Sequence, residues 1–185
     1  MRAVLMLPAL LLVGCATPSA ATRVDTRSEN VEQQRLAAVA PGEGGSAPAQ
    51  YALAATEGYR MPQLNAGPSP VAGDRDPRQT LPPTRICLQV VVTAEGIVER
   101  SLVLSDRPEC QAGAATENAV LVQAAQEAVA QWRFVPAAVC TFAAGHVPAN
   151  RGDCRSATHV EPVAVSLLYA FTFEIVKGQQ IVRQH

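Results

Sequence analysis

The sequence predicts an α+β fold in which a small three-stranded antiparallel sheet packs against one main helix, in the order strand, strand, helix, strand. Three observations lead to this prediction. Residues 86–92 form an apolar, β-branched stretch followed by a turn and a second such stretch. Residues 116–132 have helical periodicity, and residues 163–175 alternate between two faces. A disordered linker is expected before this domain.

The first two strands are expected to form a hairpin. Residues 86–92 and 97–104 are the strands, and Thr93-Ala94-Glu95-Gly96 is the turn between them. Gly96 stands where the turn needs a positive φ, which glycine adopts without steric cost.

The helix is expected at about residues 116–132. Leu121, Ala125, Ala128 and Trp132 are spaced so that they share one face, which predicts a helix lying close on the sheet. Trp132 would be buried at that contact. Pro136 moves the preceding residue out of helical conformation, so the chain should become extended directly after the helix.

The last strand is expected at residues 163–175. Its inward face is the alternating set Val165, Leu167, Tyr169, Phe171 and Phe173. Between Pro136 and this strand, residues 140–158 contain glycine, proline, asparagine and aspartate. They are expected to form a loop-rich insert.

The part before the domain divides into three segments. Residues 1–14 are interpreted as a signal peptide of the lipoprotein type, and residues 15–58 as a flexible tether with at most a fraying helix at 29–38. Residues 59–83 are rich in proline and are expected to be an extended lead-in, with at most a short helix at 74–79. Residues 84–185 are the folded domain.

The segment Leu12-Val13-Gly14-Cys15 resembles a bacterial lipobox. The apolar run that it ends is too short to span a bilayer, which needs roughly 20 apolar residues. The resemblance implies cleavage before Cys15 and attachment of lipid, such as palmitate, to that cysteine. By resemblance to sorted lipoproteins, Ala16 rather than aspartate in the next position favours the outer membrane, facing the periplasm. Cleavage by an ordinary signal peptidase near Ala16 or Ala20 is the alternative.

Four other cysteines remain, and in an exported chain an even number predicts two disulfides. Three pairings are possible. The hairpin brings Cys87 near the loop that contains Cys110, and Cys140 and Cys154 bracket the insert, so Cys87–Cys110 and Cys140–Cys154 are the expected pairs. A metal site formed by Cys140, His146, Cys154 and His159 is a weaker alternative, because the spacing matches no tight knuckle.

Three motifs resemble the C-terminal domain of TonB-type proteins. They are VTAEGIV at residues 92–98, AVAQWRFVPA at residues 128–137 and FTF at residues 171–173. The resemblance covers about residues 81–175. The residues that carry it are Gly96, Trp132, Arg133, Phe134, Pro136, Phe171 and Phe173. Gly96 supplies the turn, Trp132 and Phe134 fill the gap between helix and sheet, and Pro136 ends the helix. These are tasks in folding, and none is expected to be catalytic.

The chain also departs from that family. A TonB energy transducer begins with an uncleaved inner-membrane helix and a long Pro-Lys and Pro-Glu spacer, whereas this chain has a lipobox and an insert with cysteines. The resemblance therefore implies a protein-binding domain that docks a periplasmic or outer-membrane partner. Two alternatives remain: participation in energy-dependent transmembrane transport through a TonB-dependent receptor, and a purely structural periplasmic role.

Composition and motifs favour a protein that is not an enzyme. The sequence contains no G-x-S-x-G elbow, no phosphate-binding loop and no H-E-x-x-H helix, and no cofactor is expected. The formal net charge of −1 gives no reason to expect nucleic-acid binding. The expected contacts are an envelope protein and, through a lipid on Cys15, the membrane.

Overall fold

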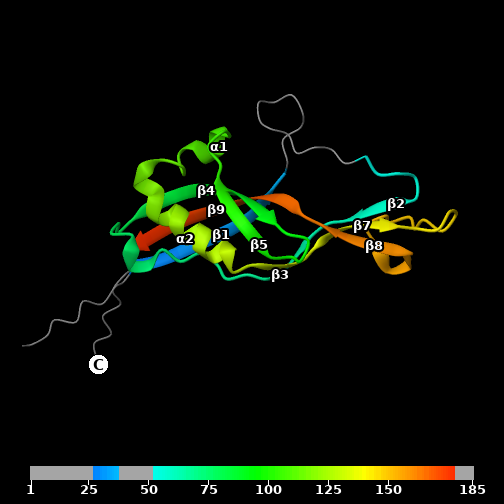
Figure 1. Ribbon diagram of the computed structural model, residues 1–185. Coiled ribbons are helices and arrows are strands. Elements are labelled where there is room, and N and C mark those ends of the chain that lie inside the picture. The colour runs from blue at the N-terminus through cyan, green and yellow to red at the C-terminus, as the bar shows by residue number, and fades with distance from the viewer. Residues whose placement is uncertain (1–26, 38–51, 178–185) are drawn as a thin grey trace, which may run out of the picture.

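The computed structural model describes residues 27–37 and 52–177. Strands account for 46% and helices for 18% of these residues, so the fold is mostly β. The predicted fold, one three-stranded sheet with one helix, is wrong: sheets of four, three and two strands are present (Figure 1). The predicted elements exist, but they are joined by strands from segments that were expected to be linker or loop.

The bounds of the strands are β1 (Arg27–Leu36), β2 (Glu57–Arg60), β3 (Gln63–Ala66), β4 (Leu81–Val92), β5 (Val98–Val103), β6 (Arg133–Val135), β7 (Ala137–Thr141), β8 (His159–Val163) and β9 (Val165–Lys177). The helices are α1 (Pro108–Gln111) and α2 (Ala119–Ala130), and three single turns of 3₁₀-helix are η1 (Gly73–Arg75), η2 (Thr116–Asn118) and η3 (Cys154–Ser156).

The main sheet has the strand order β1-β9-β4-β5, and all its pairs are antiparallel. The predicted hairpin is confirmed as β4 and β5, and the predicted last strand as β9. Helix α2 lies across one face of this sheet (Figure 1). This helix is shorter than the predicted 116–132, and Trp132 follows its end. The predicted inward residues Leu121, Ala125, Ala128 and Trp132 are all buried. The contact between α2 and the sheet forms the largest core.

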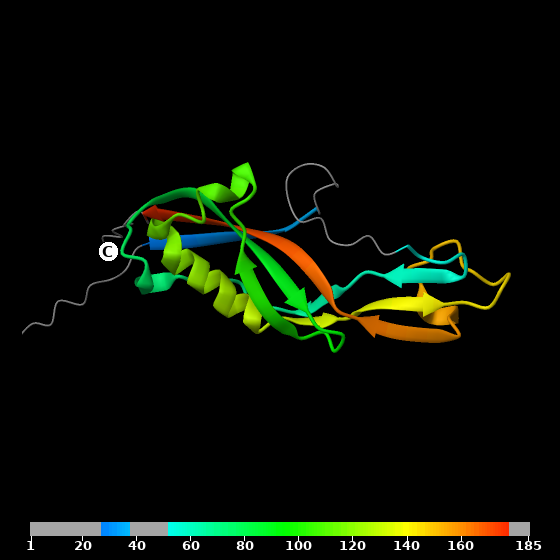
Figure 2. The ribbon, with the colours of Figure 1, turned by 45° about the horizontal axis from the view of Figure 1, so that its top comes forward.

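The second sheet has the order β2-β7-β8 and projects from one end of the main body (Figure 2). Strands β7 and β8 flank the segment that was expected to be only loop, and β2 pairs along the other side of β7. This sheet has its own small core of Ala138, Cys140 and Phe142, packed against Val147, Cys154 and Ala157. The two-stranded pair β3–β6 connects the exit of α2 with the lead-in.

Part of the predicted tether is a strand. Residues 27–36 form β1, where a spacer or a fraying helix was expected, and they pair with β9 along their whole length. The lead-in contains the end of β2, all of β3 and the start of β4. Of the short helix expected at 74–79, only the beginning is helical, as part of η1. The polar composition of residues 27–36 hid the strand, because its stability comes from backbone pairing with β9 rather than from an apolar face of its own.

Candidate functional site

The aromatic residues of the helix exit are buried, as their predicted role in the fold requires. Trp132 is fully buried, and its ring lies 4.9 Å from that of Tyr169 and 5.7 Å from that of Phe171, centroid to centroid. Its indole Nε1 donates a hydrogen bond to the carbonyl oxygen of Pro68 at 2.9 Å. Phe134 is nearly buried and meets Trp132 edge-on. A side chain enclosed in this way stabilises the fold and is closed to a ligand.

The other motif residues join the hairpin to the helix exit. Gly96 has φ +79°, and its carbonyl oxygen accepts a hydrogen bond from the Phe134 amide at 2.8 Å. Arg133 is exposed, and its backbone forms an isolated antiparallel β-bridge with that of Ile97. Pro136 separates β6 from β7, so the chain is extended after the helix, as predicted. Phe171 and Phe173 are buried on the face of β9 that α2 covers.

Both expected disulfides are present. Cys87 is joined to Cys110 and Cys140 to Cys154, with Cα–Cα distances of 5.5 and 5.6 Å. Because both of its cysteines are engaged in a disulfide, the alternative metal set with His146 and His159 is not formed. In the described ranges no three histidine, cysteine, aspartate or glutamate side chains gather in a way that could hold a metal ion. Cys15 lies outside the described residues.

The outer edge of β5 is one end of the main sheet. Leu104 donates its amide to the Cys87 carbonyl, so by alternation Leu102 bonds toward β4, and the backbone groups of Ser101 and Val103 point away from it. Gln126 donates to the outward carbonyl of Ser101 at 3.3 Å. The side chain of Leu102 is 49% exposed. This edge is therefore short and partly capped.

The opposite end of the main sheet is β1, which has no buried side chain. Val31 is partly buried against the main core opposite Phe173, and Leu36 contacts the small cluster around Cys87 and Cys110. A sequence signal for this strand is almost absent, because its only strong β-former is Val31. Sequence reasoning therefore missed the element that covers the edge of β9.

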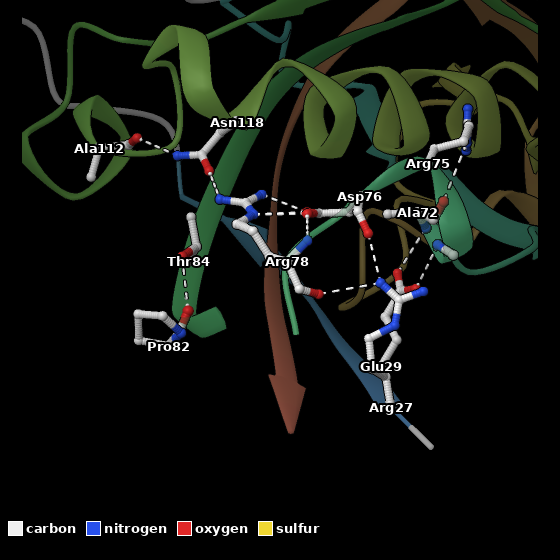
Figure 3. Close-up of polar contacts among 11 residues, drawn as sticks. Arg27, Glu29, Ala72, Arg75, Asp76, Arg78, Pro82, Thr84, Ala112 and Asn118 are labelled. Carbon is white, nitrogen blue, oxygen red and sulfur yellow. Dashed lines mark hydrogen bonds and ion pairs between the residues drawn. The ribbon is translucent and has the colours of Figure 1, made fainter. Parts of the chain in front are cut away.

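Polar contacts fix one end of β1 to residues 72–78, and we call this arrangement the polar clamp (Figure 3). The guanidinium of Arg27 donates to the carbonyl oxygen of Asp76 at 2.6 Å and to the Asp74 carboxylate at 2.8 Å. The carboxylate of Glu29 accepts hydrogen bonds from the amides of Ala72 at 2.7 Å and Gly73 at 2.8 Å. Charged groups make hydrogen bonds about twice as strong as neutral ones.

The clamp continues into the interior through Asp76, which is 1% exposed. The Arg78 side chain donates to both oxygens of this carboxylate and also to the side-chain oxygen of Asn118, at the start of α2 (Figure 3). Hydrogen bonds from Arg78 hold the pKa of Asp76 below its usual range, while burial acts in the opposite direction. The same pair raises the pKa of Arg78. Residues 72–78 are thus fixed to both β1 and α2.

No family model, curated protein or solved structure matches this chain. Within residues 27–37 and 52–177, no helix has the length and apolarity that crossing a membrane requires.

Proposed function

We propose that this chain is an envelope lipoprotein whose TonB C-terminal-like domain is non-catalytic and binds a periplasmic or outer-membrane protein. The observation that supports it most is a main sheet that can be extended. Strand β5 turns backbone groups outward, and β1 at the other end buries none of its side chains. Such edges accept an extended segment of another protein by strand addition.

The arrangement of the motif residues supports the same proposal. Three residues of the TonB-type motifs, Trp132, Phe134 and Phe171, belong to the core between α2 and the sheet. They therefore stabilise the sheet, and the edges of the sheet remain available for binding a partner. A binding domain needs a rigid scaffold with an accessible edge, and this core provides the scaffold.

The binding test uses the full-length protein. A tagged copy is incubated with envelope extracts, recovered proteins are identified, and hydrogen exchange is measured on the purified complex. Strand addition predicts one stoichiometric partner and a changed exchange pattern confined to β1, β9 or β5. Recovery of a TonB-dependent receptor would favour the transport role. A footprint only on the second sheet, or no stable partner, would reject binding through the main sheet.

The membrane anchor is a separate part of the proposal. Lipid on Cys15 would hold the domain at a membrane, because several acyl chains give a stable anchor. Ala16 after Cys15, as in lipoproteins sorted outward, favours the periplasmic side of the outer membrane. Mass spectrometry of the mature N-terminus tests this. A triacylated Cys15 supports the anchor, and an unmodified N-terminus beyond Cys15 rejects it. A Cys15→Ala variant serves as the control and should leave the membrane fraction.

A further inference from the structure

Strand β1 differs from its neighbours in the main sheet. Its sequence, RSENVEQQRL, is largely polar, and none of its ten side chains is buried. In β9, by contrast, Leu167, Tyr169, Phe171, Phe173 and Ile175 are all buried. Strand β1 therefore depends on backbone pairing and on a few end contacts, and β9 depends on the core. An element with so little buried apolar surface belongs to the least stable part of a fold.

The contacts at the ends of β1 are polar: those at its start are part-buried, and the one at its end is exposed. At its start, Arg27 and Glu29 form the polar clamp with residues 72–78. At its end, Arg107 donates to the carbonyl oxygen of Ala37 at 2.7 Å. Hydrogen bonds of this kind fix a register without burying a large surface. They can be broken while the core between α2, β4 and β9 stays formed, because β1 contributes no buried residue to it.

The edge of β9 that β1 covers is longer than the free edge of β5 at the other end of the main sheet. Its register with β1 runs from Arg27 opposite Lys177 to Leu36 opposite Leu168, without a bulge. The β5 edge is shorter, begins next to a bulge and is partly capped by Gln126. A long regular edge that carries apolar side chains is a strong acceptor for another strand, and uncovered it promotes aggregation.

We propose that β1 is a displaceable guard strand. It covers the strand-accepting edge of β9, and release of the polar clamp makes that edge available to a partner. The occupant is an extended segment of the partner protein, antiparallel to β9, with an apolar side chain at the position of Val31 and polar neighbours. The pattern of β1 itself defines this chemistry, since Val31 is its one side chain packed against the main core. The identity of the occupant rests on the proposed function, whereas the displacement of β1 does not.

Hydrogen exchange on the full-length protein tests the displacement. In the wild type, β1 amides should exchange at least about tenfold faster than those in the centre of β4. Glu29→Ala removes the acceptor for two amides and should speed exchange in β1, and in the β9 amides bonded to it, about tenfold further. Glu32→Ala, on the exposed face of the same strand, is the matched control. Equal protection of β1 and β4, or equal effects of the two variants, would overturn the proposal.

A peptide with the sequence of residues 27–36 is the probe for the vacated edge. Labelled with fluorescein, it should bind Glu29→Ala at least about tenfold more tightly than the wild type, because less of the edge is covered. The same peptide with aspartate in place of valine at position 31 should not bind. Equal affinity for both proteins would contradict displacement. Concentration-dependent dimers of Glu29→Ala would show that a second copy, rather than a partner, takes the edge.

The complex recovered from envelope extracts separates this inference from the proposed function. If the β1 amides lose protection while the β9 amides that pair with β1 keep theirs, the guard strand and the binding function both hold. If β5 alone becomes protected, the binding function holds and the guard strand is wrong. If β1 opens and accepts the peptide but no partner is recovered, the guard strand holds and the binding function is wrong.

Discussion

Trp132 packs between the end of α2 and the main sheet, and its replacement by a small residue should lower the stability of the fold. The indole is fully buried against Tyr169 and Phe171 and donates to the Pro68 carbonyl. Trp132→Ala should lower the free energy of unfolding by about 3–5 kcal/mol, because it leaves a cavity and an unpaired carbonyl. Chemical denaturation measures the change. The control is Val135→Ala, at a partly exposed site. This variant should change the free energy of unfolding by about 0.5 kcal/mol or less.

Asp76 should make stability depend on pH. Since its pKa in the folded protein lies below its usual value, the folded state binds fewer protons than the unfolded state. Its contribution is therefore complete above the unfolded pKa of about 3.9 and disappears as pH falls through the folded pKa. Asp76→Asn should cost about 1.5–3 kcal/mol at pH 7, and the difference from the wild type should shrink below about pH 4.

Urea unfolding at several pH values measures this difference. The control is Asp74→Asn, since Asp74 is 92% exposed and its pair with Arg27 is open to solvent. It should change stability by about 0–1 kcal/mol. A difference between Asp76→Asn and the wild type that stays constant from pH 7 to pH 3 would show that the charge of Asp76 does not stabilise the fold.

At the scale of elements, the turn between β4 and β5 is fixed to the helix exit by close contact. A Cβ added to Gly96 would collide with the Phe134 carbonyl group, whereas one added to Gly145 would meet no atom within 4 Å. Both glycines have positive φ, +79° and +76°. Gly145→Ala should cost about 1 kcal/mol for the backbone alone. Gly96→Ala should cost at least about 1 kcal/mol more, as the Phe134–Gly96 hydrogen bond breaks. Thermal unfolding of both variants measures this difference, and equal costs would contradict the contact.

The elements that sequence reasoning found are those with a local signal. The β4–β5 hairpin has a glycine turn between apolar strands, α2 has an apolar face, and β9 alternates. The elements it missed are formed by pairing between distant segments. Strand β1 pairs with β9 across most of the chain, and β2 pairs with β7. Their polar sequences carry no period of two, so nothing local distinguishes them from linker.

The same distinction applies to the candidate site. Hairpin geometry was enough to predict Cys87–Cys110 as a pair, because the cysteines lie near one short loop. The polar clamp could not be predicted, since it joins Glu29 to the amides of Ala72 and Gly73 across a long separation in sequence. Isolated arginine and glutamate residues in a polar stretch are typical of a solvated surface, and only the fold shows that these are paired.

For the whole molecule, separate cores imply separate stabilities. The main core lies between α2 and the four-stranded sheet, and the second sheet has its own core around Cys140 and Phe142. The two clusters share no residue. The small core holds few large side chains, so the second sheet depends on the Cys140–Cys154 disulfide more than the main sheet depends on Cys87–Cys110.

This dependence predicts how the molecule opens when one disulfide is removed. The double variant Cys140→Ala/Cys154→Ala frees the insert, and the chain-entropy model gives a loss of about 3 kcal/mol for a loop of this size. Hydrogen exchange should rise in β2, β7 and β8 and stay unchanged in α2, β4 and β9, because the main core keeps all its residues. The double variant Cys87→Ala/Cys110→Ala should instead raise exchange around α1. If either variant raised exchange uniformly across both sheets, the two sheets would form one cooperative unit and the guard strand would not open independently of the second sheet.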